Sequence, residues 1–229
     1  MKNTCDCKMI PVALFLLIHI NLAAQRTWDT IPTVPDHYLK RSEVFKKEPV
    51  VKGKVMFLGN SITEGGNWKK LLKDSTVMNR GISGDITFGI LNRLNELVRH
   101  QPSKIFLLIG INDISKNIPD EVILENLFTI LNKIHSGTPK TKIYVQSILP
   151  TNNSFKQFPK NYDKNDHVIT INTQLQKYAE RMNYTYVDLY TDFLDKESKL
   201  EAKYSSDGLH LSAAGYLHWV EILKKNKHL

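Results

Sequence analysis

The stretch VMFLGNSITEGG, residues 55–66, joins an apolar run directly to a glycine-containing turn. Its first apolar residues, bounded by turn formers, indicate a short buried strand. The Gly-Asn-Ser that follows allows the chain to leave the strand sharply, and so exposes the Ser61 hydroxyl at the carboxyl end of that strand. A serine at this place can be a nucleophile, a phosphate ligand or a helix cap.

Four further apolar runs lie along the chain and alternate with longer segments of helical period. The expected strands cover residues 54–58, 76–79, 104–109, 142–147 and 184–188, and the helical stripes lie within 91–98, 124–134 and 168–182. Parallel strands need crossover helices, and these cover both faces of the sheet. The alternation therefore predicts an α/β fold: a three-layer α/β/α sandwich with a doubly wound, mostly parallel five-stranded sheet of flavodoxin-like type.

The first residues have the order of a secretory signal: lysines, then an apolar run from Met9 to Ile20, then Ala23 and Ala24. The alternative is an uncleaved membrane anchor, but the run is too short to span a bilayer comfortably. The expected organisation is a signal peptide at 1–24, a lead-in at 25–50 and one domain at 51–229. We therefore expect a secreted or periplasmic protein without stable membrane insertion after cleavage.

Composition narrows the classes of site and partner. Both cysteines, Cys5 and Cys7, precede the apolar run, so the mature chain has no disulfide, thiol nucleophile or cysteine metal site. The formal charge is +8, but the lysines are spread through helical patterns and do not gather with aromatic residues. This distribution is typical of a solvated surface and argues against nucleic acid as a partner, while an acidic glycan or a membrane surface remains open.

Residues with catalytic chemistry follow the first three strands. In open parallel sheets, ligands bind outside the carboxyl ends of the strands. Ser61 follows the first strand, Gly84 the second and Asn112 the third, and near the C-terminus Asp207 precedes His210 by three positions. A serine attacks only when an imidazole takes its proton, a carboxylate orients that imidazole, and N–H groups hold the resulting oxyanion. The residue types for this chemistry are therefore all present.

Each of these residues also has an ordinary structural interpretation. Ser61 can cap the following helix, Gly84 can serve a left-handed turn, and Asn112 can form an Asx turn. Asp207 and Gly208 can form a simple turn before a helix. Taken singly, each residue is better explained by structure than by catalysis, so the argument for a site depends on their combination.

The combination resembles a known family. The segments GNSIT, GISGD, GIND and DGLH are similar, in order and rough spacing, to the four sequence blocks of the SGNH (GDSL) hydrolases, over the chain from about Val50 to its end. The resemblance implies that Ser61 is the nucleophile and that Asp207 and His210 complete a triad. It also implies an oxyanion hole formed by the Ser61 amide, Gly84 and Asn112, with no cofactor and no metal. Asn60 departs from the aspartate that the family often has at that position.

The resulting hypothesis is a secreted serine esterase that hydrolyses short-chain oxygen esters through an acyl-enzyme. The expected acyl group is acetyl, and the expected substrate is a small acylated carbohydrate. A lipid or lysophospholipid esterase similar to platelet-activating-factor acetylhydrolase is the second candidate. A non-catalytic phosphate- or glycan-binding module is the third, although a phosphate site leaves Asp207 and His210 without a role. The irregular segment at 149–165, LPTNNSFKQFPKNYDKN, is either a substrate-facing loop or a plain surface excursion. The oligomeric state is open.

Overall fold

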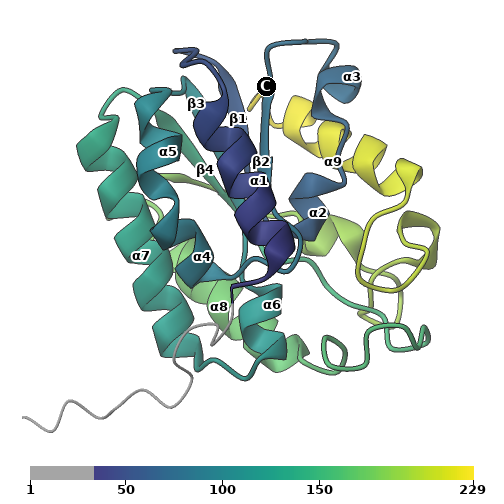
Figure 1. The fold of residues 1–229 in the computed structure, drawn as a ribbon. Coiled ribbons are helices and arrows are strands. Elements are labelled where there is room, and N and C mark those ends of the chain that lie inside the picture. Colours follow the sequence, from purple (N-terminus) through teal and green to yellow (C-terminus); the bar gives the residue numbers. More distant parts are fainter. Residues whose placement is uncertain (1–33) are drawn as a thin grey trace, which may run out of the picture.

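The computed structural model describes residues 34–229 and contains the predicted parallel sheet (Figure 1). The strands are β1 (Val55–Gly59), β2 (Met78–Gly81), β3 (Lys104–Leu108), β4 (Lys142–Gln146) and β5 (Thr185–Val187). All neighbours are parallel, in the order β2-β1-β3-β4-β5. The fold class predicted from the sequence is confirmed. The predicted signal peptide, 1–24, lies outside the described residues.

Helices cover both faces of this sheet (Figure 1). They are α1 (Asp36–Lys47), α2 (Ser61–Glu64), α3 (Trp68–Leu72), α4 (Thr87–Asn92), α5 (Leu94–Arg99), α6 (Ile111–Ser115), α7 (Asp120–Gly137), α8 (Asn165–Tyr178) and α9 (Ala213–Lys225), with short 3-10 turns η1 (Thr191–Phe193) and η2 (Ala202–Tyr204). Helices α4, α5 and α8 pack against α7 on one face, whereas α3 packs against α9 on the other. This is the doubly wound arrangement.

The register of the sheet brings three strand ends level with one another. Gly59, the last residue of β1, lies opposite Gly81 of β2 and Leu108 of β3. Because the strands are parallel, the segments that follow these three residues all leave the same edge of the sheet. The turns expected to carry catalytic residues therefore begin side by side.

An aromatic cluster fixes the position of α9 on the sheet. Phe57 of β1 stacks on Trp68, with ring centroids 3.8 Å apart, and on Phe106 at 4.8 Å. Trp219 of α9 meets the Trp68 ring edge-on at 4.8 Å, and its indole N–H donates to Gln146 Oε1 over 2.7 Å. Large buried rings contribute strongly to stability, so this cluster holds α9, and the turn that precedes it, in a defined place.

Most strand ends differ from the expected ones by one or two residues, and two differences from the sequence-based expectation have a cause in side-chain bonding. The second strand begins at Met78 rather than residue 76, because the Asp74 carboxylate accepts hydrogen bonds from the Thr76 amide and hydroxyl, at 2.8 and 2.7 Å, and forms a turn there. The stripe at 91–98 belongs to two helices that meet at Arg93, where φ is −110° and ψ is 11°. The Arg93 guanidinium donates to the Asp85 carboxylate and to two backbone carbonyls at the strand ends, so tertiary bonding interrupts the helix.

The lead-in contains a helix that the sequence analysis did not anticipate. Helix α1 lies over the β2 edge (Figure 1), where its Tyr38 and Phe45 form a small apolar cluster with Ile82, the residue that follows β2. The Arg99 guanidinium of α5 donates to the Phe45 carbonyl over 2.7 Å. The described part of the lead-in is thus an integral part of the domain.

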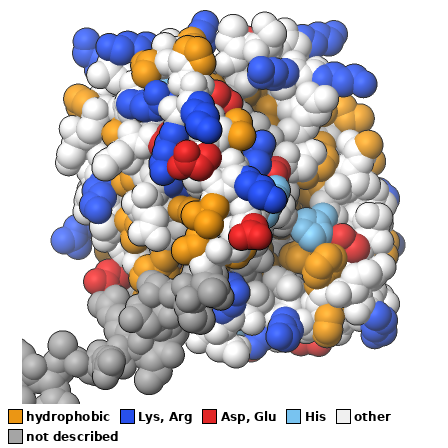
Figure 2. Space-filling view, in the orientation of Figure 1, with side chains coloured by type: hydrophobic (Ala, Val, Ile, Leu, Met, Phe, Trp, Pro, Cys, Tyr) orange, Lys and Arg blue, Asp and Glu red, His pale blue; other side chains and the backbone are white. Residues whose placement is uncertain are grey.

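Lysine and arginine side chains are spread around the visible face of the molecule and do not form one patch there (Figure 2). Between residues 34 and 229, none of the helices combines the length and the hydropathy of a membrane-spanning segment.

Candidate active site

Ser61 occupies the first position of α2, immediately after β1. The preceding residue, Asn60, is the helix cap: its side-chain oxygen accepts a hydrogen bond from the Ile62 amide at 3.0 Å. The alternative interpretation of Ser61 as the cap is therefore wrong. Because a neighbouring residue satisfies the helix terminus, the Ser61 hydroxyl is available for another partner.

That partner is His210. The Ser61 Oγ lies 2.9 Å from His210 Nε2, and His210 Nδ1 lies 2.8 Å from Asp207 Oδ2. An ionised carboxylate only accepts hydrogen bonds, so it selects the imidazole tautomer with the proton on Nδ1. Nε2 is then left to accept the Ser61 proton. The His210 side chain is 29% exposed, which leaves this chain of hydrogen bonds open to a small molecule from solvent.

The turn that carries Asp207 and His210 is held by its own backbone. Asp207 Oδ1 accepts hydrogen bonds from the amides of Leu209, at 2.9 Å, and His210, at 2.7 Å. Burial raises the pKa of Asp207, but these amides and the imidazole together lower it below its ordinary value. The Asp207 carboxylate is therefore charged at neutral pH.

Gly208 lets this turn pack against the 149–165 loop. Its φ is +77°, and a Cβ at this position would lie 2.3 Å from the carbonyl oxygen of Asn152. In the same loop, the Tyr162 hydroxyl donates to the Asp207 carbonyl over 2.5 Å, and the Phe158 ring meets the His210 ring edge-on at 5.0 Å. The loop is thus a wall of the site rather than a remote excursion. The length, polarity and aromatic residues of this segment were the sequence signal of this role.

Gly84 lies in a tight turn beyond β2. The Asp85 amide donates to the Ile82 carbonyl over 3.1 Å, and Gly84, the third residue of this β-turn, has a φ of +78°. A positive φ at the third position is the signature of a type II turn, which favours glycine. No heavy atom lies within 4 Å of the place where a Cβ would be, so there is open space beside the Gly84 backbone.

Asn112 follows β3, the next strand along the chain, and is joined to the same turn. Its Nδ2 donates to the Asp85 carbonyl over 2.9 Å, which links the start of α6 to the residue that follows Gly84. The amide has two N–H groups, so this bond occupies one and leaves a second donor. The structure therefore brings Ser61, Asp207 and His210 into one hydrogen-bonded chain, and it brings Gly84 and Asn112 together in a second cluster at the same sheet edge.

Two buried aspartates support that second cluster. Asp113 accepts hydrogen bonds from the Thr87 hydroxyl, at 2.6 Å, and the Thr87 amide, at 3.0 Å, and its burial raises its pKa to about 7. Asp85 forms a buried ion pair with Arg93 at 2.8 Å. Asp113 thus joins α6 to the start of α4, and Asp85 joins the Gly84 turn to Arg93.

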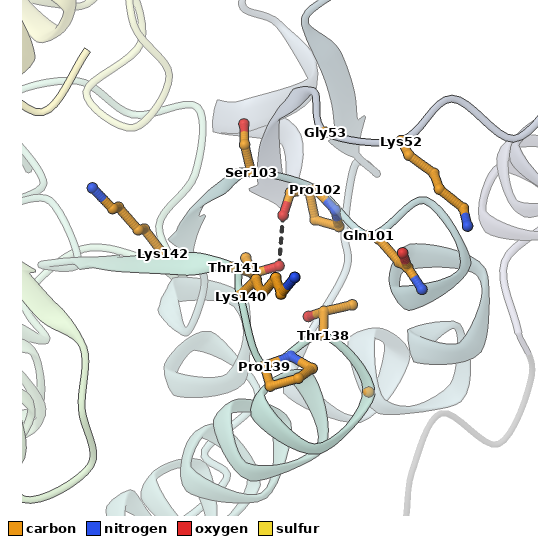
Figure 3. Close-up of a pocket in the computed structure, with 11 residues that line it drawn as sticks. Lys52, Gly53, Gln101, Pro102, Ser103, Thr138, Pro139, Lys140, Thr141 and Lys142 are labelled. Atoms are coloured by element: carbon orange, nitrogen blue, oxygen red, sulfur yellow. Dashed lines mark hydrogen bonds between the residues drawn. The ribbon is translucent and has the colours of Figure 1, made fainter.

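The described residues contain no ready metal site, since no group of three or more His, Cys, Asp and Glu side chains comes together within 34–229. A cavity of about 630 Å³ lies at the opposite end of the sheet, before β1, β3 and β4. Figure 3 shows Pro102, Thr141 and the lysines Lys52 and Lys140 in its wall, with the Thr141 hydroxyl donating to the Pro102 carbonyl over 2.6 Å. This cavity shares no residue with the serine and histidine cluster.

The chain is similar in sequence to known proteins. The model of the GDSL-like Lipase/Acylhydrolase family matches residues 57–217. Among curated relatives, the platelet-activating factor acetylhydrolase IB subunit alpha2 of Rattus norvegicus is 27% identical over 168 residues, which cover 71% of this chain and 70% of the relative.

Solved structures give the same result. A Streptococcus pneumonia protein, provisionally described as a platelet activating factor, is 32% identical with a TM-score of 0.75, over 83% of this chain and 92% of the other. A mutant of an acetyl-xylooligosaccharide esterase from Geobacillus Stearmophilus has a TM-score of 0.62 at 19% identity, over 80% of this chain and 97% of the other. At that identity the likeness concerns the fold alone.

Proposed function

We propose that this protein, which belongs to the GDSL-like lipase/acylhydrolase family and is a serine ester hydrolase, removes short acyl groups from oxygen esters through an acyl-enzyme on Ser61. The observation that carries the proposal is the chain of hydrogen bonds from Ser61 through His210 to Asp207, at 2.9 and 2.8 Å. A serine beside a neutral, carboxylate-oriented imidazole is the arrangement that acyl transfer requires.

In the first step, Ser61 Oγ attacks the ester carbonyl carbon while His210 Nε2 takes the hydroxyl proton. Negative charge then develops on the carbonyl oxygen. The Ser61 amide, the Gly84 amide and the second N–H of Asn112 Nδ2 serve as donors to this oxyanion. Asp207, whose pKa is lowered, stabilises the imidazolium that forms.

Collapse of the tetrahedral intermediate breaks the ester bond. His210 returns the proton to the leaving alcohol oxygen, and the acyl group stays on Ser61 as an ester. Water then attacks the acyl carbon while His210 Nε2 takes one of its protons, and the same donors hold the second oxyanion. The bond between the acyl carbon and Ser61 Oγ breaks, His210 returns the proton to Ser61 Oγ, and the carboxylic acid leaves. The cycle returns every proton and needs no cofactor.

For the substrate we infer an acetylated carbohydrate. The 149–165 loop sets the partly exposed ring of Phe158 beside the catalytic turn, and an aromatic ring suits the apolar face of a sugar. The same fold also occurs in an esterase of acetylated xylooligosaccharides. The N-terminal sequence supports export, which would bring the enzyme to extracytoplasmic glycans.

A lipid ester is the second candidate, favoured by the likeness to platelet-activating factor acetylhydrolase. Two measurements separate the candidates. The first compares kcat/KM on acetylated oligosaccharides with kcat/KM on p-nitrophenyl esters of rising chain length and on a lysophospholipid. A preference for acetylated sugars supports the proposal. A preference for the lipid overturns the proposed substrate class.

The second measurement tests the reaction type. A fluorophosphonate probe should label wild-type protein on Ser61 and should not label Ser61→Ala, because only an activated serine attacks phosphorus. The control is Ser136→Ala, which removes an exposed hydroxyl on α7, away from the catalytic turns, and should keep the labelling. Wild-type protein that stays unlabelled would overturn the serine esterase mechanism and favour a binding module.

A further inference from the structure

In the turn at residues 82–85, the three residues other than Gly84 are each held by contacts with a different part of the protein. Ile82 is fully buried under Tyr38 and Phe45 of α1. Asp85 pairs with Arg93, and its carbonyl accepts the Asn112 amide. The remaining neighbour of Gly84 is Ser83, and its anchor is Glu64.

The Glu64 carboxylate binds Ser83 twice. Glu64 Oε2 accepts one hydrogen bond from the Ser83 amide and one from the Ser83 hydroxyl, both over 2.6 Å. Short hydrogen bonds to an ionised carboxylate are among the stronger ones in proteins. They hold the Ile82–Ser83 peptide and the Ser83 side chain, next to the peptide that carries the Gly84 N–H, and therefore limit where the Gly84 amide can point.

Glu64 is itself held in place by α1. Arg41 Nε lies 3.1 Å from Glu64 Oε1, and His37 Nε2 lies 3.0 Å from Glu64 Oε2. Arg41 also donates to the Gly81 carbonyl over 3.3 Å. The Glu64 side chain is 19% exposed, and although burial raises its pKa, its bonds to Ser83 and His37 and the charge of Arg41 lower it overall. The carboxylate is therefore ionised and lies between Ser83 on one side and Arg41 and His37 on the other.

The position of Glu64 in the chain explains why this matters for catalysis. Helix α2 is a single turn that begins with Ser61 and ends with Glu64. One rigid turn thus carries the nucleophile at its first residue and binds the Gly84 turn through its last. A displacement of the Gly84 turn relative to Ser61 must break the bonds between Glu64 and Ser83.

We propose that Glu64 is a positioning residue that holds the Gly84 amide in register with Ser61, with Arg41 and His37 of α1 holding Glu64. The inference rests on the proposed function, because it takes Gly84 as an oxyanion donor. Preorganised donors lower the barrier only when they are already aimed at the developing charge. Loss of the Glu64 bonds should therefore weaken binding of the transition state more than binding of the substrate.

The test measures kcat, KM and the affinity for a trifluoromethyl ketone, which forms an oxyanion on a serine. Glu64→Ala should lower kcat by about tenfold or more with KM within about twofold, and should weaken ketone binding by a similar factor, less than loss of a direct donor would cost. Glu64→Gln keeps one acceptor oxygen but loses the charge, and should lie between wild type and Glu64→Ala.

The matched control is Glu48→Gln. Glu48 also joins the end of α1 to β2, through an ion pair with Arg80 at 2.6 Å, but it does not touch the Gly84 turn. It should leave kcat and ketone affinity unchanged. Hydrogen exchange adds a readout that is independent of activity. The amides of residues 82–85 should exchange faster in Glu64→Ala than in wild type, and at the wild-type rate in Glu48→Gln.

The outcomes are distinct. If Glu64→Ala keeps kcat and ketone affinity within twofold of wild type, or changes KM alone, the positioning role is overturned. If Glu64→Ala does not fold, Ser83→Ala decides: removal of one of the two bonds should lower kcat severalfold, and unchanged kcat overturns the role. Failure of the proposed function is separate, because wild-type protein would then not react with a fluorophosphonate at all.

Discussion

Ser61 Oγ lies 2.9 Å from His210 Nε2, although 149 positions separate the two residues in the chain. The parallel sheet places Ser61 at the end of β1, and the aromatic cluster around Trp219 places α9, and the turn before it, at the same edge. The whole fold therefore determines the distance between Ser61 and His210. Substitutions at these two residues have different expected consequences.

Removal of the nucleophile should abolish turnover without unfolding the protein. We expect Ser61→Ala to lower kcat by about 10⁴-fold or more, as loss of a triad member does, since the acyl-enzyme can no longer form. Steady-state kinetics on a p-nitrophenyl acetate substrate measures the loss, and circular dichroism checks the fold. Near wild-type turnover in folded Ser61→Ala protein would end the serine esterase mechanism.

Asn112 should contribute mainly to the transition state. We expect Asn112→Ala to lower kcat by roughly 10² to 10³ with little change in KM, because an oxyanion donor bonds most strongly once charge has developed. The control is Asn132→Ala, on the exposed face of α7, which should behave as wild type. A rise in KM without a fall in kcat would make Asn112 a substrate contact instead.

Asp207 and His210 should differ in the size of their effects. Asp207→Asn keeps a side-chain oxygen that can accept the amides of Leu209 and His210, but it no longer holds the correct imidazole tautomer. We expect a folded enzyme slowed by up to about 10⁴-fold, and a loss at least as large for His210→Ala, which lacks the proton acceptor. An active His210→Ala enzyme would show that another base serves Ser61.

Asp113 should make stability depend on pH in a predictable direction. Its folded-state pKa is about 7, above the ordinary value, so the folded protein binds the proton first as pH falls. Stability from this group is therefore present at low pH and lost as pH rises through about 7. Each pKa unit corresponds to about 1.4 kcal/mol, so wild type should gain roughly 2–3 kcal/mol from this group between pH 8 and pH 5.

The variant Asp113→Asn removes that titration and keeps an oxygen for Thr87. Urea unfolding at pH 5 and pH 8 should show a smaller difference between the two pH values in Asp113→Asn than in wild type. Equal differences in the two proteins would mean that Asp113 stays charged in the folded state, with its burial fully offset by Thr87 and its other hydrogen bonds.

A chelator should not affect the reaction. The proposed mechanism assigns every proton transfer to His210, and the described residues, 34–229, hold no cluster of three metal-ligating side chains. We expect kcat after dialysis against EDTA to match that of untreated enzyme. Activity that disappears with EDTA and returns with added zinc would contradict this expectation.

The positions of the strands, the α/β class and the candidate residues could all be predicted from the sequence, because each depends on local pattern. Apolar runs bounded by turn formers mark strands wherever they pack, and a polar residue after such a run in a parallel sheet lies at the ligand-binding edge. This rule and the spacing of Asp207 before His210 made Ser61 and His210 candidates, and the order of the four segments that resemble the SGNH (GDSL) hydrolases then gave them catalytic roles.

Other features needed the tertiary structure, since they depend on which distant groups meet. Nothing local distinguishes Asn60 from Ser61 as the cap of α2; the partner of Ser61, His210, comes from the far end of the chain. The helical stripe at 91–98 is regular in sequence, yet Arg93 interrupts it because its guanidinium donates to the Asp85 carboxylate and to two backbone carbonyls at the strand ends.

The anchoring of the Gly84 turn is the clearest case. The sequence pattern assigns no role to Glu64, and it gives the segment that contains α1 only as a lead-in to the domain. Only the packing of α1 over Ile82 brings Arg41 to Glu64, and only the level ends of β1 and β2 bring Glu64 to Ser83. Sequence pattern determines which face of each element is buried, whereas the pairing of charged side chains across elements is decided by register and packing, which no local pattern encodes.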